Sequence, residues 1–107
     1  MTEQISPQEF NEAGGVDDWR VVSDAAWAYF KTGSFRAGVA LVDVIGDLAD
    51  AANHHPDIDL RYPRVVVRLV THDVGGLSSR DVELARQISA AARDLGVTAD
   101  PSELPAE

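Results

Sequence analysis

The segment RVVVRLVTH, residues 64–72, is the strongest strand signal in the chain and sets the expected fold. β-branched residues dominate it, and such residues suit a pleated, half-buried surface. Successive side chains of a strand point to opposite faces of the sheet. One face is therefore expected to carry Val65, Val67, Leu69 and Thr71, and the other Arg64, Val66, Arg68, Val70 and His72.

Two helices are expected on either side of this strand. Apolar residues recur at spacings of three and four from Phe35 to about Asn53, which predicts one helical stripe: Phe35, Val39, Val42, Ile45, Ala49 and Ala52. Pro56 disfavours the α conformation at the residue before it, so this helix is expected to end near the histidine pair. After the turn DVGG, Ser78 can cap a second helix that stops at Gly96. Its stripe would be Val82, Ala85, Ile88, Ala92 and Leu95.

The N-terminal third adds a helix and a hairpin. SPQEF (6–10) carries a capping box with proline at the first helical position, and Gly14-Gly15 should end this helix. WRVV (19–22) and AAWAYFK (25–31) predict two strands joined by a polar pair. DIDLRY (57–62) can add a short strand. The order α-β-β-α-β-β-α predicts an α+β fold, with a four-stranded antiparallel sheet and helices packed on one face.

Length and composition limit the classes of protein that this chain can represent. Its 107 residues predict one domain over residues 1–98, followed by a polar, disordered tail at 99–107. No cysteine is present, which excludes disulfides and a cysteine nucleophile. The formal charge of −9 argues against nucleic acid as a partner. No apolar run is long enough for a membrane span and no signal pattern is present, so we expect a cytoplasmic protein.

The three histidines are the candidate functional residues. His54 and His55 stand at the expected end of the longer helix, and His72 ends the long strand. Asp50 lies one helical turn before His54, so its carboxylate can hydrogen-bond His54 and fix the tautomer of the ring. His55 points elsewhere and is free to contact a ligand.

Three interpretations of these histidines are open from the residues alone. They can be surface or capping residues without a function. They can form a zinc site, although adjacent histidines diverge and the helical i, i+4 spacing is absent. They can also form an acid–base site for a neutral organic substrate, because no serine or cysteine nucleophile, phosphate-binding loop or dinucleotide motif is signalled.

The spacing of the polar residues resembles the signature of the pterin-4a-carbinolamine dehydratases, which are small α+β proteins. The residues that carry the resemblance are Asp50, His54-His55-Pro56, Tyr62, His72 and Asp81. THDVGGLSSRDVELARQI (71–88) is similar to that family's third histidine, glycine turn and following helix. YFKTGSFRAGVALVDVIGDLAD (29–50) is similar to its strand-to-helix segment. The resemblance extends from about Trp19 to Leu95.

The resemblance implies dehydration of 4a-hydroxytetrahydrobiopterin, or a related pterin carbinolamine, to the quinonoid dihydropterin, in the recycling of tetrahydrobiopterin. It implies no metal and no cofactor. His54 and His72 would be the acid–base pair, and His55 would bind and orient the pterin. Asp50 would support the pair of histidines. Asp81 would be either catalytic or a helix cap, and Tyr62 would either pack beside the pterin or anchor its strand.

A rival interpretation comes from proteins of this fold that act without catalysis. The chain would then be an assembly factor or a dimerisation coactivator that binds another protein. Members of the family often form homodimers or homotetramers. Val66 and Val70 on the outer sheet face, together with the exposed strand edge, are the surfaces expected to associate.

Overall fold

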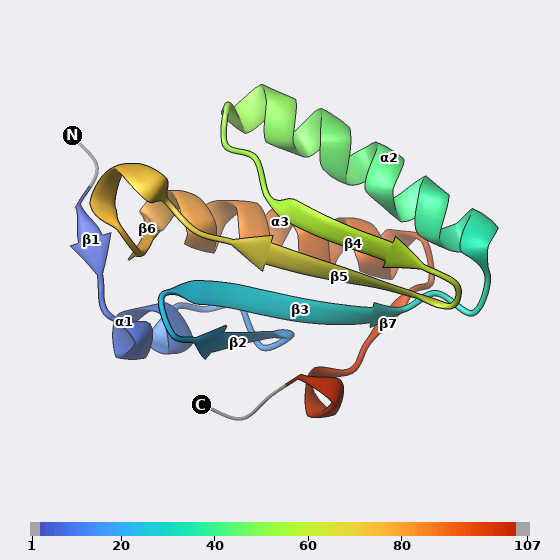
Figure 1. Cartoon of the computed structure of the whole chain (residues 1–107), viewed down its shortest axis with the longest axis horizontal. Coiled ribbons are helices and arrows are strands. Elements are labelled where there is room, and N and C mark those ends of the chain that lie inside the picture. The colour runs from blue at the N-terminus through green and yellow to red at the C-terminus, as the bar shows by residue number, and fades with distance from the viewer. Residues whose placement is uncertain (1–2, 105–107) are drawn as a thin grey trace.

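The computed structural model describes residues 3–104 and has an α+β fold (Figure 1). Its α helices are α1 (Pro7–Glu12), α2 (Phe35–Ala52) and α3 (Ser79–Asp94). Its strands are β1 (Gln4–Ile5), β2 (Trp19–Val22), β3 (Ala25–Lys31), β4 (Asp57–Arg61), β5 (Arg64–Leu69), β6 (Leu77–Ser78) and β7 (Thr98–Ala99). Two short 3₁₀ turns, η1 (His72–Val74) and η2 (Pro101–Glu103), complete the elements. The predicted fold class and antiparallel sheet are confirmed.

The main sheet has five strands, so the prediction of four is wrong by one. The strand order is β2-β3-β5-β4, with every neighbouring pair antiparallel, and β7 pairs with β3 beyond the end of β2. A separate two-stranded ribbon joins β1 to β6. The strands β1, β6 and β7 have two residues each, which is too short to show any alternation in the sequence.

The C-terminal segment is ordered further than expected. Residues 99–107 were predicted to be disordered, but β7 and η2 continue the structure to Leu104. The backbone N–H of Asp100 donates to the carbonyl of Tyr29 at 2.8 Å, and the Lys31 ammonium lies 2.8 Å from the Asp100 carboxylate. The free edge of β3 beyond β2 therefore supplies the partners that the polar tail needs. Residues 105–107 lie outside the described residues.

One hydrophobic core lies between the sheet and the helices. Val65, Val67 and Leu69 of β5 are fully buried, and they face Leu41 and Ile45 of α2. The same core includes Leu84, Ala85 and Ile88 of α3 and Phe10 of α1. All three helices thus pack on one face of the sheet, as predicted. Figure 1 shows α3 passing behind the strands.

The predicted stripe of α2 is only partly correct. Ile45 and Ala49 are buried as expected, but Phe35 and Val39 are exposed, and Gly38 and Leu41 take the inward positions instead. A side chain at Gly38 would force Leu60 to shift, because a Cβ at this position would lie 2.6 Å from the Cδ1 of Leu60. The absence of a side chain brings α2 down onto β4. Leu95, expected in the stripe of the last helix, is also exposed.

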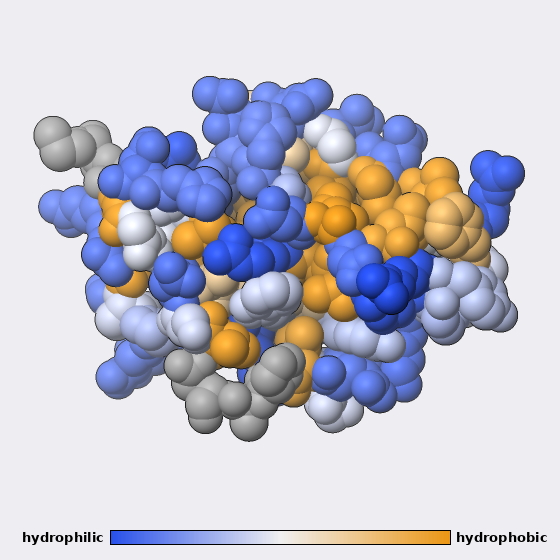
Figure 2. Space-filling model, viewed as in Figure 1, coloured by the Kyte–Doolittle hydropathy of each residue, from blue (hydrophilic) through white to orange (hydrophobic). Residues whose placement is uncertain are grey.

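No α helix of residues 3–104 lies on the opposite face of the sheet, where only the segment of η2 approaches Trp27 and Tyr29 (Figure 1). Arg68 lies over the ring of Trp27 at 5.7 Å, and Arg64 lies over Tyr29 at 5.8 Å. Figure 2 also shows hydrophobic atoms around the N-terminal half of α2 and the neighbouring strands. Within residues 3–104 the structure contains no helix with the length and apolar character of a membrane span.

Candidate active site

The C-terminal end of α2 turns the two adjacent histidines in different directions. Asn53 adopts a left-handed conformation with φ 50° and ψ 44°. Its N–H donates to the carbonyl of Asp50 at 3.2 Å, and the N–H of His54 donates to the carbonyl of Ala49 at 3.1 Å. These two bonds form the Schellman motif that often ends a helix. The chain therefore reverses at Asn53, so that His54 enters the interior while His55 stays exposed.

His54 pairs with a carboxylate from a different helix. Its Nε2 lies 2.6 Å from Oδ1 of Asp81, which is in the first turn of α3. The side chain of Asp81 is completely buried, and only 8% of the His54 side chain is exposed. A charge or polar group this deep requires a hydrogen-bond partner, because water cannot compensate for a missing one.

The second oxygen of Asp81 is also fully engaged. Oδ2 accepts a hydrogen bond from Oγ1 of Thr71 at 2.7 Å and another from the backbone N–H of Ser78 at 3.0 Å. The bond to Ser78 belongs to a capping box at the start of α3. Asp81 therefore caps α3, which is one of the two roles that the sequence left open, and it also contacts His54; its catalytic role stays a prediction.

The prediction that Asp50 bonds His54 is wrong, because Asp50 bonds the other histidine. Its Oδ1 lies 3.0 Å from Nε2 of His55, and both side chains are largely exposed. The spacing of four residues would place Asp50 and His54 on one helical face only if the helix continued to His54. The left-handed turn at Asn53 removes His54 from that face.

His72 reaches the same end of the sheet from the other side. The predicted strand 64–72 ends earlier, at Leu69, and His72 begins the 3₁₀ turn η1. Thr71 and Gly76 form an antiparallel bridge across this turn, with the Thr71 N–H donating to the Gly76 carbonyl at 2.8 Å. Gly75 closes the turn with φ +68°, a conformation that side chains disfavour.

These segments enclose one cleft. It has a volume of about 200 Å³ and is lined by Asn53, His54, His55, Val70, Thr71, His72, Asp73 and Arg80. Pockets for drug-sized ligands are typically about 300–1,000 Å³, so this cleft suits a small molecule. All three histidines of the chain line it, as the sequence analysis predicted. Val70 is buried here, which corrects its assignment to an associating outer surface.

Tyr62 is the one proposed site residue that lies apart from the others. It follows β4 at the turn to β5, in a cis peptide bond to Pro63, and is 68% exposed. The histidine pair precedes β4 at its opposite end. The five residues of β4 span about 17 Å at the usual rise of a strand. Tyr62 therefore does not line the cleft.

Sequence reasoning missed Arg80 and Thr71 as cleft residues. Arg80 lies in the first turn of α3, and its Nη2 is 3.4 Å from the Asp73 carboxylate. An arginine in the first turn of a helix is locally unfavourable, because the helix dipole is positive there. This unfavourable position was the feature of the sequence that could have pointed to a role for Arg80. Thr71 gave no signal, because a threonine in a strand is ordinary.

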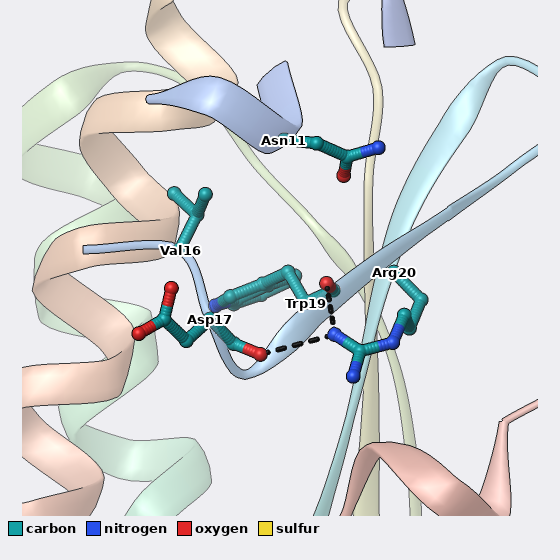
Figure 3. A pocket seen from close by; sticks show the side chains of 5 residues that line it. All are labelled: Asn11, Val16, Asp17, Trp19 and Arg20. Carbon is teal, nitrogen blue, oxygen red and sulfur yellow. Dashed lines mark hydrogen bonds between the residues drawn. The ribbon is translucent and has the colours of Figure 1, made fainter. Parts of the chain in front are cut away.

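A second cleft lies elsewhere and lacks comparable chemistry (Figure 3). It has a volume of about 400 Å³ and is lined by Asn11, Val16, Asp17, Trp19 and Arg20. The guanidinium of Arg20 donates to the backbone carbonyls of Asp17 and Trp19, and the indole N–H of Trp19 donates to Ser89.

The described residues 3–104 contain no cluster of His, Asp or Glu side chains arranged to hold a metal ion.

Comparisons with known proteins point to one family. The family model described as pterin 4 alpha carbinolamine dehydratase matches residues 3–91. A protein from Nocardia farcinica is 42% identical over 86% of this chain and 98% of its own length. One from Thermosynechococcus vestitus is 37% identical over 83% of this chain and 95% of its own length. Both carry the name "Putative pterin-4-alpha-carbinolamine dehydratase".

A solved structure is similar as well. The crystal structure of a transcriptional coactivator/pterin dehydratase from Brucella melitensis has a TM-score of 0.77 and 30% identity to this chain. The alignment covers 83% of this chain and 98% of that one. The matched region of the family model includes all three histidines and Asp81. The chain described here therefore belongs to the pterin-4a-carbinolamine dehydratase family.

Proposed function

We propose that this protein dehydrates 4a-hydroxytetrahydrobiopterin, or a related pterin carbinolamine, to the quinonoid dihydropterin. The observation that carries the proposal is the convergence of His54, His55 and His72 on one small cleft. His72 lies on a different element from the adjacent pair His54-His55, and surface histidines without a function would have no reason to meet across that separation. Membership of the family supplies the class of substrate.

The reaction requires two proton transfers. An acid gives a proton to the 4a-hydroxyl, and the C4a–O bond breaks to release water. A base removes the proton of the ring nitrogen, and the electron pair of that N–H bond forms the new C=N bond. Each positioned acid or base contributes on the order of 10²–10⁴-fold to such a rate. We assign these two roles to His54 and His72.

His55 and the two carboxylates have supporting roles in this proposal. His55 is exposed at the mouth of the cleft and binds and orients the pterin, with Asp50 holding its ring from outside. Asp81 holds the ring of His54 from the interior. Because Tyr62 stands at the far end of β4, we assign it to anchoring the β4–β5 turn.

Spectrophotometric assay of a 4a-hydroxypterin with single variants tests the proposal. His54→Ala and His72→Ala should each lower kcat by about 10²–10⁴-fold, whereas His55→Ala should mainly raise KM. Tyr62→Ala is the matched control and should leave both constants unchanged. Absence of dehydration by the folded wild-type protein would refute the proposal. A loss of kcat in His55→Ala with a loss of affinity alone in His54→Ala would reverse the two roles.

A protein-binding role is the second candidate. It is favoured by Phe35 and Val39, which are 50% and 37% exposed on α2, and by the name of the Brucella melitensis protein. We propose that such a surface joins copies of this chain into a homodimer or homotetramer or receives another protein. Phe35→Glu should then lower the mass measured by light scattering without lowering kcat. An unchanged mass would exclude Phe35 from an interface between copies of this chain.

A further inference from the structure

A cluster of buried polar side chains lies directly beneath His54. Five polar side chains of residues 3–104 are classed as buried, and four of them, His54, Thr71, Ser78 and Asp81, are in this cluster. The fifth, Ser89, accepts a hydrogen bond from Trp19 elsewhere in the core. Burial of several polar groups together is unfavourable unless all of them are satisfied. Their hydrogen bonds therefore limit where each proton can be.

The protons of the cluster can be assigned by counting donors. Thr71 has one hydroxyl proton and donates it to Oδ2 of Asp81 at 2.7 Å. The 2.7 Å contact between the hydroxyls of Thr71 and Ser78 must then use the proton of Ser78. The Ser78 hydroxyl in turn accepts from the N–H of Arg80 at 3.2 Å. The result is a one-way chain from Arg80 through Ser78 and Thr71 to Asp81.

This direction fixes the last bond of the chain. The Ser78 backbone N–H also donates to Oδ2 of Asp81, so this oxygen accepts two hydrogen bonds and carries no proton of its own. An ionised carboxylate only accepts hydrogen bonds. The 2.6 Å contact with His54 therefore requires a proton on Nε2 of His54.

The other ring nitrogen of His54 is left for the cleft. Nδ1 has no hydrogen-bond partner among residues 3–104. Within those residues, Thr32 Oγ1 is the only side-chain polar atom that lacks both a hydrogen-bond partner and contact with solvent. Nδ1 of His54 is therefore accessible to solvent. In neutral imidazole, the nitrogen without a proton is an acceptor. Because His54 lines the cleft, Nδ1 is the ring nitrogen that can offer a free electron pair to a bound molecule.

We propose that Thr71 and Ser78 are positioning residues which, through Asp81, hold the His54 proton on Nε2 and leave Nδ1 to accept the proton of the substrate. The inference rests on the proposed dehydration and deepens it by assigning the base. Nδ1 takes the proton from the ring nitrogen of the pterin, and Asp81 stabilises the imidazolium that forms. His72 is then the group that gives a proton to the departing hydroxyl.

Nitrogen-15 NMR of the full, substrate-free chain tests the tautomer without any assay of activity. In its neutral form, His54 should show a protonated Nε2 and an unprotonated Nδ1. Thr71→Val has nearly the same shape but no hydroxyl, and should shift this equilibrium toward the other tautomer. Thr71→Ser should restore the wild-type pattern. Thr32→Val is the matched control, because the Thr32 hydroxyl has no partner to lose, and it should change nothing.

Kinetics of the same variants separate positioning from a structural role. Thr71→Val should lower kcat by about 10–100-fold, the usual effect of losing one hydrogen bond to a charged group, with KM near its wild-type value. A wild-type His54 protonated on Nδ1, or a Thr71→Val protein with wild-type tautomer and kcat, would overturn the inference. If Thr71→Val does not fold, the wild-type tautomer alone decides. If the protein shows the expected tautomer but no dehydratase activity, the proposed function is refuted. The inference that the hydrogen-bond chain fixes the tautomer of His54 would still hold.

Discussion

His54 and His55 are neighbours in the chain, and each pairs through Nε2 with a carboxylate, yet the two pairs occupy opposite environments. The side chains of His54 and Asp81 are 8% and 0% exposed and meet at 2.6 Å. Those of His55 and Asp50 are 58% and 83% exposed and meet at 3.0 Å. The same chemical contact is thus made once in the interior and once in water.

The difference shows that burial, and not the presence of a partner, gives such a pair its influence. Water can replace either member of an exposed pair, so the pair contributes about 0–1 kcal/mol to stability. Asp81 cannot be replaced by water, and its donors Thr71 and Ser78 would be left unpaired with it. We therefore expect the histidine with the buried partner to control the rate and the other histidine to influence affinity.

The largest effect is expected for Asp81→Asn. The amide oxygen would keep the bonds from Thr71 and Ser78, so the amide N–H₂ would face His54 and require an acceptor at Nε2. The proton of His54 would then move to Nδ1, and the base would be lost. We expect kcat to fall by about 10²–10⁴-fold. The measurement is steady-state kinetics with circular dichroism as a control for folding, and a kcat within threefold of wild type would contradict the comparison.

Stability should follow the same contrast. Asp81→Ala removes the partner of His54 and the acceptor of the capping box of α3. Breaking a buried pair from one side typically costs about 3–5 kcal/mol. Asp50→Ala is the matched variant and should change the free energy of unfolding by no more than about 0.5 kcal/mol. Urea unfolding of both proteins measures the difference, and equal midpoints would show that the two pairs are equivalent.

A smaller effect on catalysis is expected when the exposed pair is altered. Asp50→Asn removes the charge that faces His55 but leaves a hydrogen-bonding group in its place. We expect a change in KM of less than about fivefold, the equivalent of 1 kcal/mol, and no change in kcat. This change should shrink further at high salt, because salt screens exposed charges. A large loss of kcat would indicate that His55 is one of the two residues that transfer protons.

The smallest effect should come from an exposed ion pair far from the cleft. The hydrogen bond from Lys31, followed by that from Ser102, holds the pKa of Asp100 below its ordinary value of 3.8. Because the pKa is lowered in the folded state, the stabilisation is present above pH 3.8 and is lost as the pH falls through the folded-state pKa.

Thermal unfolding of Asp100→Asn measures this effect. The variant should unfold slightly earlier than wild type at neutral pH, and the two should coincide once the pH is below the folded-state pKa. Activity should be unchanged at neutral pH. A difference in stability that persists in acid would show that Asp100 acts through its position in η2 and not through its charge.

Much of the fold could be predicted because its signals are local. The hairpin of β2 and β3, the alternation in β5, the capping box at Ser6 and the cap at Ser78 all appear in the structure. The inward face of α2 could not be read correctly, since apolar residues occupy more than one stripe of this helix. The structure buries the stripe that contains Gly38, Leu41, Ile45 and Ala49, with Gly38 lying against Leu60. The two-residue strands are likewise defined only by their partners.

The candidate site divides in the same way. The sequence identified the three histidines that line the cleft, but it paired Asp50 with the wrong one and gave no role to Thr71. Residues four apart lie on one face only within a continuous helix, and this helix ends at Asn53. Beyond that residue the direction of His54 depended on a left-handed turn and on a carboxylate 27 positions away along the chain.

The sequence by itself determined the longer elements, because periodicity and capping act over a few neighbouring positions, and its signature residues indicated the family and the histidines proposed to transfer protons. The tertiary structure alone decided which carboxylate serves which histidine and which of them lies in the interior. Those properties arise where segments distant in the chain come together and exclude water, and the strength of a polar contact depends on that exclusion.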